Sequence, residues 1–384
     1  MSGMNEGASP VLRKRPSAWH RPVWWINVLA AIVLLITLLA PHVSPVRIWW
    51  LGLLALTYPF QLILHFGFIT YWMFFRRRRM LLSLAVILLG WTHAGDHFQV
   101  FGSSAPPFDP GEKGVKLMTY NVRLFDLYNW SHNQQTRDKI FDLFKREDPE
   151  ILCLQEFFYS PDEQFFRTRD PLLKEFRFKH MHDRYTHRSK YQQHFGIATF
   201  SAFPIIDTGS IAFTSNPNNQ CIWSDLVVHG DTIRVYNAHL ASYHFGDADY
   251  KFLERFEKNA NPGDSIRTGG IRILKRLRRA MRLRAGEVEK IADHMAQSPY
   301  PVIYCGDMND VPMSYSYARL REGHEDAFVN SGRGHGGTYI GKLPPLRIDH
   351  ILHSPSIATW DMQTLPDELS DHRALTCSLA VMPE

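Results

Sequence analysis

The sequence predicts an α/β domain that follows a membrane segment built from transmembrane helices. Three long runs without Asp, Glu, Lys or Arg lie within the first hundred residues. After them come five short apolar runs of strand length, and each of these ends in polar residues. Stretches with helical spacing lie between the short runs. This mixture favours layered α and β structure over a helical bundle or an all-β barrel.

The membrane segment is predicted at residues 23–100, with helices at 23–40, 48–75 and 80–94. The first run has 18 uncharged residues, which is about 27 Å of helix and enough to cross a bilayer. A signal peptide is the competing interpretation, but more apolar sequence follows instead of a cleavage site. The second run is longer than a span requires and is expected to tilt or kink at Pro59. The third run is about 22 Å long as a helix, so it either spans or lies at the interface.

The arginines predict how this segment is oriented. Arg76 to Arg79 form a cluster whose insertion into the bilayer centre would cost roughly 2.5–3.5 kcal/mol per side chain, so they lie at an interface. With three spans, this cluster and the basic segment 1–22 fall on the cytoplasmic side under the positive-inside rule. The chain after residue 100 then lies outside the cytoplasm in a multi-pass membrane protein. If the third run does not span the membrane, the chain after residue 100 lies in the cytoplasm.

The rest of the chain is predicted to be a linker at 101–113 and one folded domain at 114–383. The linker contains three prolines and two glycines. In the domain, Gln135 to Lys145 and Ile271 to Met295 place apolar residues at helical spacing. Nine basic and two acidic residues precede residue 101, which leaves 34 basic and 36 acidic residues after it. A domain so close to neutral is not a generally basic nucleic-acid binder. The four cysteines form no CxxC pair, so buried free thiols are expected.

The polar residues that follow the five strand-like runs are the main signal for function. They are rich in oxygen donors and contain no cysteine. Such donors suit Mg²⁺, or Mn²⁺, rather than structural zinc, and a hard cation of this kind stabilises charge on a phosphoryl group. Taken singly, each of these residues is more often a turn former or a helix cap. The set comprises Asn121, Glu156, Asn237, His239, Asp307, Asn309, Asp349, His350, Asp371 and His372.

The order of the motifs resembles the endonuclease/exonuclease/phosphatase superfamily, which includes DNase I-like nucleases, neutral sphingomyelinases and inositol-polyphosphate phosphatases. The resemblance covers about residues 114–383 and implies a four-layer α/β sandwich with the site at one edge. The motifs that carry it are TYNVR at 119–123, LQE at 154–156, FGIATFSAFPI at 195–205, NAHL at 237–240, GDMND at 306–310, RIDHI at 347–351 and SDH at 370–372.

The resemblance also implies roles for the metal ligands and the residues that handle water. Glu156 would be the main magnesium ligand, Asp371 a further ligand, and Asn121 a metal or phosphate contact. Asp307 would orient or deprotonate the attacking water. Asn309 would hold that water or a phosphate oxygen.

Histidines complete the implied site. Asp349 would hydrogen-bond His372 and fix its tautomer, so that the ring addresses the phosphate. His239 would protonate the leaving oxygen or bind the phosphate, and Asn237 would contact the substrate. These two residues in the NAHL motif favour the nuclease, sphingomyelinase and phosphatase branches over apurinic-site endonucleases. His350 is on the opposite side of its strand from Asp349 and is interpreted as structural.

Eight basic residues and no acidic one lie between Arg267 and Arg284. A solvated helix face is one interpretation of this pattern. A patch that meets anionic lipid headgroups or a polyanionic substrate is the other. Arg284 falls on the apolar stripe of the helix, so it is either buried against an acidic partner or extends its stem along apolar surface.

The leading hypothesis is a membrane-anchored, magnesium-dependent phosphoesterase that hydrolyses phosphodiester or phosphomonoester bonds by metal-assisted attack of water. Its substrate would be a phosphate ester such as a lipid headgroup, a nucleotide or nucleic acid. One alternative is a nonspecific DNase-like endonuclease. The other is a non-catalytic, membrane-tethered binding module, which would have no need of the full set Glu156, Asp307, Asn309, Asp349 and His372.

Overall fold

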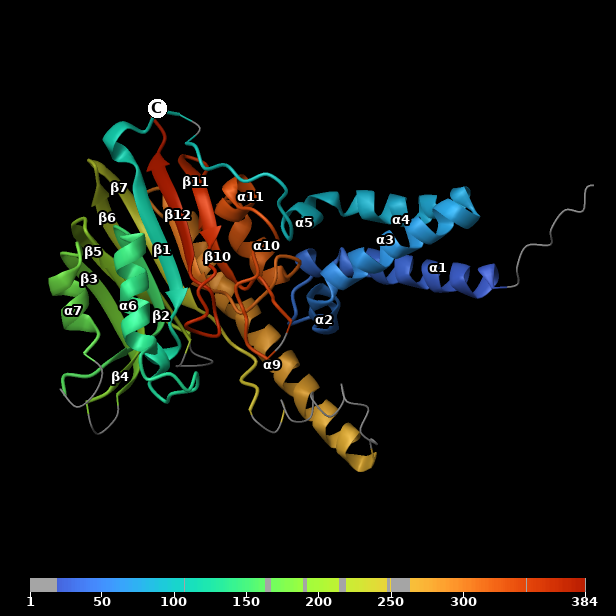
Figure 1. Ribbon diagram of the computed structural model, residues 1–384, viewed down its shortest axis with the longest axis horizontal. Coiled ribbons are helices and arrows are strands. Elements are labelled where there is room, and N and C mark those ends of the chain that lie inside the picture. The colour runs from blue at the N-terminus through green and yellow to red at the C-terminus, as the bar shows by residue number, and fades with distance from the viewer. Residues whose placement is uncertain are drawn as a thin grey trace, which may run out of the picture.

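The computed structural model places a bundle of helices beside a two-sheet sandwich (Figure 1). Most of the predicted cytoplasmic segment 1–22 lies outside the described residues. The structure describes the following parts of the chain: residues 19–106, 108–162, 167–188, 192–213, 219–246, 249, 263–342 and 344–383.

Three helices of the N-terminal part run side by side and lead away from the sandwich (Figure 1). They are α1 (His20–Thr37), α3 (Tyr58–Phe75) and α4 (Arg77–Leu89). The chain reverses at Arg76, which leaves helical geometry with φ −152°. The arginine cluster therefore lies at the end of the bundle far from the sandwich, whereas three short elements lie at the near end: η1 (Ala40–His42), α2 (Trp50–Leu56) and α5 (Trp91–Gly95).

The lengths of these helices differ from the predicted spans. Among the described residues, His20–His42 is long and apolar enough to cross a membrane, with a mean hydropathy of 2.5. α2 and α3 qualify only as a bent pair, with 60° between them. The predicted run 48–75 is thus two helices, and the break lies beside Pro59, where the sequence predicts a kink. α4 has 13 residues, about 20 Å, which is short for a full span.

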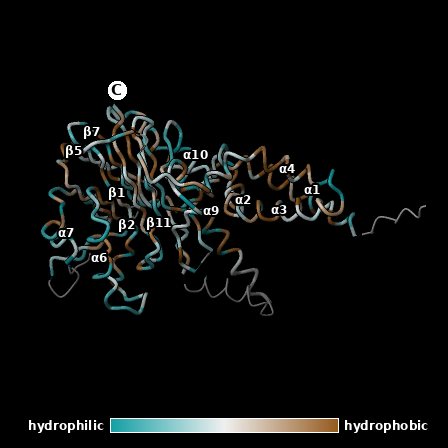
Figure 2. The backbone as a smooth tube through the Cα atoms, turned by 45° about the horizontal axis from the view of Figure 1, so that its top comes forward, coloured by the Kyte–Doolittle hydropathy of each residue, from teal (hydrophilic) through white to brown (hydrophobic). Residues whose placement is uncertain are grey.

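Buried polar side chains connect the three helices near their middles. Ser83 of α4 donates a hydrogen bond to Asn27 Oδ1 of α1 at 2.8 Å, and its hydroxyl lies 3.0 Å from His65 Nδ1 of α3. All three side chains are fully buried, although apolar residues line the helices around them (Figure 2). Such contacts fix how apolar helices pack against one another.

The sandwich consists of two mixed six-stranded sheets in the described chain. The first has the order β11-β12-β1-β2-β4-β3 and the second the order β5-β6-β7-β8-β10-β9. The strands of the first are β1 (Val115–Asn121), β2 (Ile151–Tyr159), β3 (His180–Arg188), β4 (His194–Ser201), β11 (Ile357–Thr364) and β12 (Leu375–Val381). Those of the second are β5 (Ile205–Ile211), β6 (Gln220–Val228), β7 (Asp231–His239), β8 (Val302–Asp307), β9 (Glu325–Asp326) and β10 (Asp349–His353).

Helices cover the outer face of each sheet, which confirms the four-layer α/β sandwich. α6 (Thr136–Glu147) and α7 (Arg169–Glu175) pack on the first sheet, and α9 (Gly263–Ala296) and α10 (Tyr315–Arg321) pack on the second. Shorter elements complete the domain: η2 (Gly111–Lys113), η3 (Arg123–Asp126) and α11 (Ala327–Ser331). The core between the sheets contains the thiols of Cys153, Cys305 and Cys377, all free and buried as expected.

The helical bundle and the sandwich share a hydrophobic cluster at their junction. Leu34 of α1, Leu51 of α2 and other apolar side chains of the bundle pack with Val311, Met313 and Ile348 of the sandwich. The predicted linker also lies against the domain, because the Ser103 amide donates to the Ser331 carbonyl at 3.2 Å. The junction is therefore a packed interface and not a flexible tether.

Candidate active site

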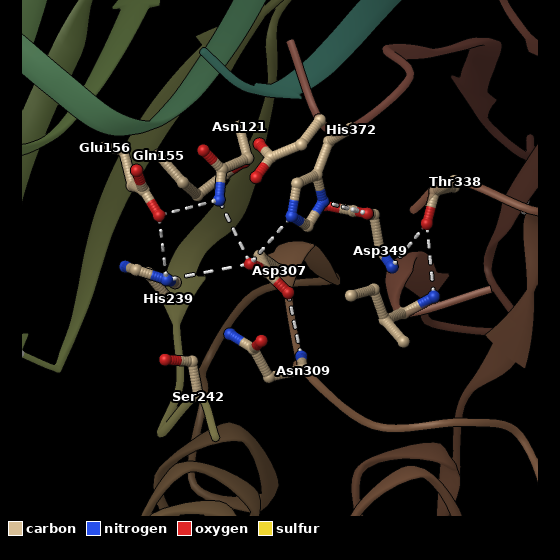
Figure 3. A network of polar contacts seen from close by, with 12 residues as sticks. Asn121, Gln155, Glu156, His239, Ser242, Asp307, Asn309, Thr338, Asp349 and His372 are labelled. Carbon is tan, nitrogen blue, oxygen red and sulfur yellow. Dashed lines mark hydrogen bonds and ion pairs between the residues drawn. The ribbon is translucent and has the colours of Figure 1, made fainter. Parts of the chain in front are cut away.

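Strand direction brings the predicted site residues to one edge of the sandwich (Figure 3). β1 and β2 are parallel, as are β7 and β8. Asn121, His239 and Asp307 end their strands, and Glu156 lies three residues before the end of β2, so the four side chains lie at the same edge. β10 is antiparallel to β8, and its first residue, Asp349, is paired with Asp307. β12 is antiparallel to β1, so the residues that precede it reach this edge too.

Asp307 lies at the centre of these side chains. One oxygen of its buried carboxylate, Oδ2, lies 3.1 Å from Asn121 Nδ2, 3.6 Å from His239 Nε2 and 3.7 Å from His372 Nε2. The other, Oδ1, accepts the backbone N–H of Asn309 at 2.8 Å. Burial raises the pKa of the Asp307 carboxyl to about 6, although His372 opposes this rise. A carboxylate with such a pKa is suited to accept a proton near neutral pH.

Glu156 reaches the site through an irregularity in β2. The pairing of β2 with β4 shifts between Leu154 and Phe157, and Glu156 has φ +47°, a left-handed conformation that is rare for glutamate. Such strain costs about 1–3 kcal/mol and concentrates at functional positions. The Glu156 carboxylate accepts from Asn121 Nδ2 at 3.3 Å and lies 3.8 Å from His239 Nε2. About a third of the side chain is exposed, so it faces the solvent side of the site.

His372 and Asp349 form the predicted pair. Asp349 Oδ2 lies 2.8 Å from His372 Nδ1, so the Nε2 side of the ring faces Asp307. Burial alone lowers the pKa of His372, but the carboxylates of Asp349 and Asp307 outweigh it and raise that pKa to about 10. In return, His372 holds the pKa of Asp349 below its usual value despite burial. The two carboxylates therefore favour the protonated ring, whose Nε2 side faces the site.

A cavity of about 200 Å³ opens in front of these groups. One part of its wall is polar and includes Glu156, His239, Asp307, Asn309 and His372. Asn309 has φ +54°, and its side chain donates to the Leu240 carbonyl at 3.0 Å. Asp371 also lines the cavity, and its carboxylate lies 3.4 Å from Arg123 Nε.

Asn237 is not brought to the cavity, contrary to the expectation that it contacts the substrate. It lies two residues before His239 on β7, so it faces the same way but one layer deeper. Its amide nitrogen lies within 3.3 Å of the Leu154 and Ala198 carbonyls, and its oxygen accepts from Gln155 at 2.8 Å. Asn237 is thus fully buried and ties the two sheets together beneath the site.

Sequence reasoning missed several residues that hold the site in place. Thr338 Oγ1 accepts the backbone N–H of Asp349 at 3.1 Å, and Ser370 Oγ donates to the Asn121 carbonyl at 2.8 Å. Gln155, within the LQE motif, donates to Thr119 Oγ1 at 3.0 Å. The motif signalled Gln155, whereas Thr338 lies outside every motif and strand-like run.

His350 and Arg284 are structural, and each is buried. His350 Nε2 lies 3.0 Å from the Asp310 carbonyl. The Arg284 guanidinium lies 3.2 Å from Asp310 Oδ2 and donates to the Ala241 carbonyl at 2.6 Å. This confirms the interpretation that Arg284 is buried against an acid. It also removes Arg284 from the exposed basic patch.

Acid should unfold the domain partly through His350. Burial lowers the pKa of His350 to about 4 from an ordinary value of 6.5, so the unfolded chain binds a proton first as the pH falls. The folded state therefore has its full stability from neutral His350 above pH 6.5, and that stability is lost as the pH falls toward 4. His350→Gln should flatten the fall in unfolding free energy across this window by up to about 3 kcal/mol, measured by denaturant titration. Exposed His132→Gln is the matched control, and equal slopes for the two variants would contradict the prediction.

Comparisons with known proteins agree with this geometry. The sequence family described as "Endonuclease/Exonuclease/phosphatase family" matches residues 118–372, and a "Domain of unknown function (DUF8431)" matches residues 20–97. No curated protein matches the chain.

Solved structures share the fold. An endonuclease/exonuclease/phosphatase from Beutenbergia cavernae has 14% identity and a TM-score of 0.50, covering 70% of this chain and 72% of that one. A family protein from Bacteroides thetaiotaomicron has 17% identity and a TM-score of 0.50, covering 71% and 98%. The human Nocturnin catalytic domain with bound sulfate has 18% identity and a TM-score of 0.49, covering 73% and 100%.

The family match extends over two thirds of the chain and includes every strand end described above. Its members are metal-dependent hydrolases that act on phosphate ester bonds. The chain belongs to the endonuclease/exonuclease/phosphatase family.

Proposed function

We propose that this protein is a membrane-anchored, Mg²⁺-dependent phosphoesterase that cleaves phosphodiester or phosphomonoester bonds by attack of water. The observation that carries the proposal is the meeting of Asp307 with His239 and His372 at the wall of one cavity, where buried Asn121 also donates to Asp307. A buried carboxylate between two imidazoles can take a proton from water while the rings address phosphate oxygens.

The donor set fits a hard divalent cation. Glu156, Asp307 and Asp371 bring carboxylates to one small cavity that contains no thiol, and such oxygens suit Mg²⁺ and also Mn²⁺. Asp307, Asp349 and His372 form a tighter group, with ligand atoms within 4.8 Å. In that group the Asp349 carboxylate is already hydrogen-bonded to His372 Nδ1. We therefore assign the cation to Glu156, with Asn121 and Asp371. A cation there would supply positive charge to phosphoryl oxygens.

Asp307 and Asn309 are assigned to the attacking water. Asp307 accepts the proton, and the backbone N–H of Asn309 holds its carboxylate in place at 2.8 Å. The Asn309 side chain lines the cavity and would hydrogen-bond the water or a phosphate oxygen.

The histidines are assigned to the phosphate and the leaving group. Asp349 positions His372, whose Nε2–H would donate to a phosphoryl oxygen as negative charge develops there. His239 stands between Glu156 and Asp307 and would protonate the leaving oxygen. No covalent protein intermediate is needed.

Glu156→Gln tests the metal assignment. We expect it to raise the Mg²⁺ concentration for half-maximal hydrolysis of a soluble diester by at least about tenfold, because a primary carboxylate ligand is lost. The assay uses the full chain in detergent micelles with DNA, an inositol phosphate, a phospholipid and bis(p-nitrophenyl) phosphate. Glu175→Gln is the control, since Glu175 is exposed on α7 and lies 3.7 Å from Lys145. Hydrolysis that chelation leaves intact would overturn the proposal.

We further propose that the N-terminal helices are a multi-pass membrane anchor and that the sandwich faces the extracytoplasmic side. The arginine cluster lies at the end of the bundle far from the sandwich, which fits the positive-inside rule with the sandwich outside (Figure 1). Alkaline phosphatase fused after residue 105 should be active, and a cytoplasmic reporter at this point should be silent. The reverse pattern would place the domain inside the cell.

The basic face of α9 is proposed to meet anionic lipid headgroups. Five of the basic residues between Arg267 and Arg284 are exposed, and one of them, Arg282, donates to the Val46 carbonyl at 3.3 Å beside the helical bundle. The Arg267 side chain lies outside the described residues. Each cation near an anionic surface contributes roughly 1 kcal/mol. These exposed residues are Arg272, Lys275, Arg278, Arg279 and Arg282.

A further inference from the structure

The helical bundle contributes a side chain to the wall of the candidate active-site cavity. Leu56, the last residue of α2, lines the same cavity as Asp307 and His239. It is the member of this lining that comes from the N-terminal helices, and the bend between α2 and α3 follows it directly. A residue of the proposed anchor therefore stands beside the reacting groups.

Packing holds Leu56 in this position. Leu51 and Ala55 of α2 belong to the hydrophobic cluster that includes Val311 and Ile348. Ile348 directly precedes Asp349, and Val311 lies two residues after Asn309, so the cluster supports the loops that carry the site. On its other side α2 lies against α9, since a Cβ on Gly52 would come within 2.8 Å of Met281 Sδ.

The cavity wall has two chemical characters. Besides the carboxylates and imidazoles, the lining includes the apolar side chains of Leu56, Phe245, Leu346 and Ile348. The lining also includes Ser242, Tyr243, His244 and Tyr339. Apolar side chains offer no hydrogen bonds to a hydrated sugar or a second phosphate, but they stabilise a hydrocarbon chain that is transferred out of water. About 200 Å³ is below the 300–1,000 Å³ of pockets that enclose drug-sized ligands, so a substrate of that size would have only part of itself inside the cavity.

The surface beyond the cavity is apolar on the side of the bundle. Trp50 of α2 is 46% exposed, and Phe60 and Ile63 of α3 are 53% and 67% exposed. In a membrane anchor these side chains face lipid. In the proposed anchor, Leu56 at the end of α2 would thus lie where the cavity meets the lipid.

From this we infer that the substrate is a membrane lipid with a phosphate ester in its headgroup, and that Leu56 determines this specificity. The phosphate enters the polar part of the cavity, and the first carbons of the lipid lie against Leu56 while its chains stay in the bilayer. The inference rests on the proposed phosphoesterase function and names its substrate class.

The test compares a long-chain phospholipid with its deacylated glycerophosphodiester, which has the same ester and headgroup but no chains. The full chain is reconstituted in vesicles of phosphatidylcholine that contain the phospholipid, and headgroup release is measured for both substrates. We expect the wild type to prefer the long-chain form. Leu56→Gln should lower the ratio of the two kcat/KM values by about tenfold, the effect of one lost apolar contact.

Two further variants keep the test decisive. Leu53→Gln places the same substitution on α2 outside the cavity and should leave the ratio unchanged. Leu56→Phe restores an apolar side chain and should recover the preference, which a folding defect would not do. An equal ratio for Leu56→Gln and wild type would overturn the inference, as would cleavage of DNA or bis(p-nitrophenyl) phosphate without cleavage of phospholipid. If the wild type hydrolysed none of these substrates, that result would instead refute the proposed function.

Discussion

Asp307→Asn is expected to lower kcat/KM for hydrolysis of a soluble phosphodiester by about 10³-fold, the range seen when a positioned proton acceptor is lost. The substitution keeps the shape of the side chain, and its amide can still occupy the space between Asn121 and His372. It removes the negative charge and the ability to accept a proton from water. The measurement is steady-state hydrolysis by the full chain at saturating Mg²⁺.

The control for this variant separates chemistry from folding. Asp293→Asn makes the same change on the exposed face of α9, where the carboxylate pairs with Arg319 at 2.7 Å. We expect it to retain wild-type activity. Asp307→Asn should keep the thermal unfolding midpoint at or above that of the wild type, because burial disfavours the charge that it removes. A loss of activity below about tenfold would mean that another group accepts the proton.

The strands that carry the site could be predicted because they are buried on both faces. Val115 to Asn121 is a nearly continuous apolar run that ends abruptly in a polar residue, and β1 has the same bounds. The runs that lead to Glu156, His239 and Asp307 are strands for the same reason, although β2 continues past Glu156 to Tyr159. Strand direction then determines where the site residues lie, because parallel neighbouring strands bring their carboxyl ends to one edge of the sheet.

Other parts of the fold depend on contacts that local sequence does not encode. β3 reads HMHDRYTHR and lies at the edge of its sheet, so it has no apolar run to identify it. Asn237 lies on the same strand as His239 and faces the same way. Only its burial one layer deeper in the sandwich shows that it is structural. Leu56 is indistinguishable in sequence from other leucines of the membrane segment. Its place in the cavity follows from packing between distant parts of the chain.

Arg284→Met is expected to lower the thermal unfolding midpoint by about 10 °C, because it leaves a buried carboxylate without its cation, at a cost of about 3–5 kcal/mol. Methionine replaces much of the apolar stem but none of the charge. Asp310 would keep hydrogen bonds from Ser316 at 2.8 Å and from the Val311 amide at 3.1 Å. These neutral donors do not offset a full negative charge in the interior. Unfolding of the full chain in micelles measures the shift.

The double variant Arg284→Met with Asp310→Asn shows whether the cost is electrostatic. If an uncompensated charge causes the loss, removing that charge should recover part of the midpoint, whereas a packing defect would persist or deepen. Arg278→Met on the exposed face of α9 is the matched control and should change the midpoint little. The guanidinium also holds the Ala241 carbonyl, two residues after His239, and pairs with Asp310, which follows Asn309. Arg284 thus joins α9 to both loops of the candidate site, and its loss should reduce activity even at temperatures where the variant is folded.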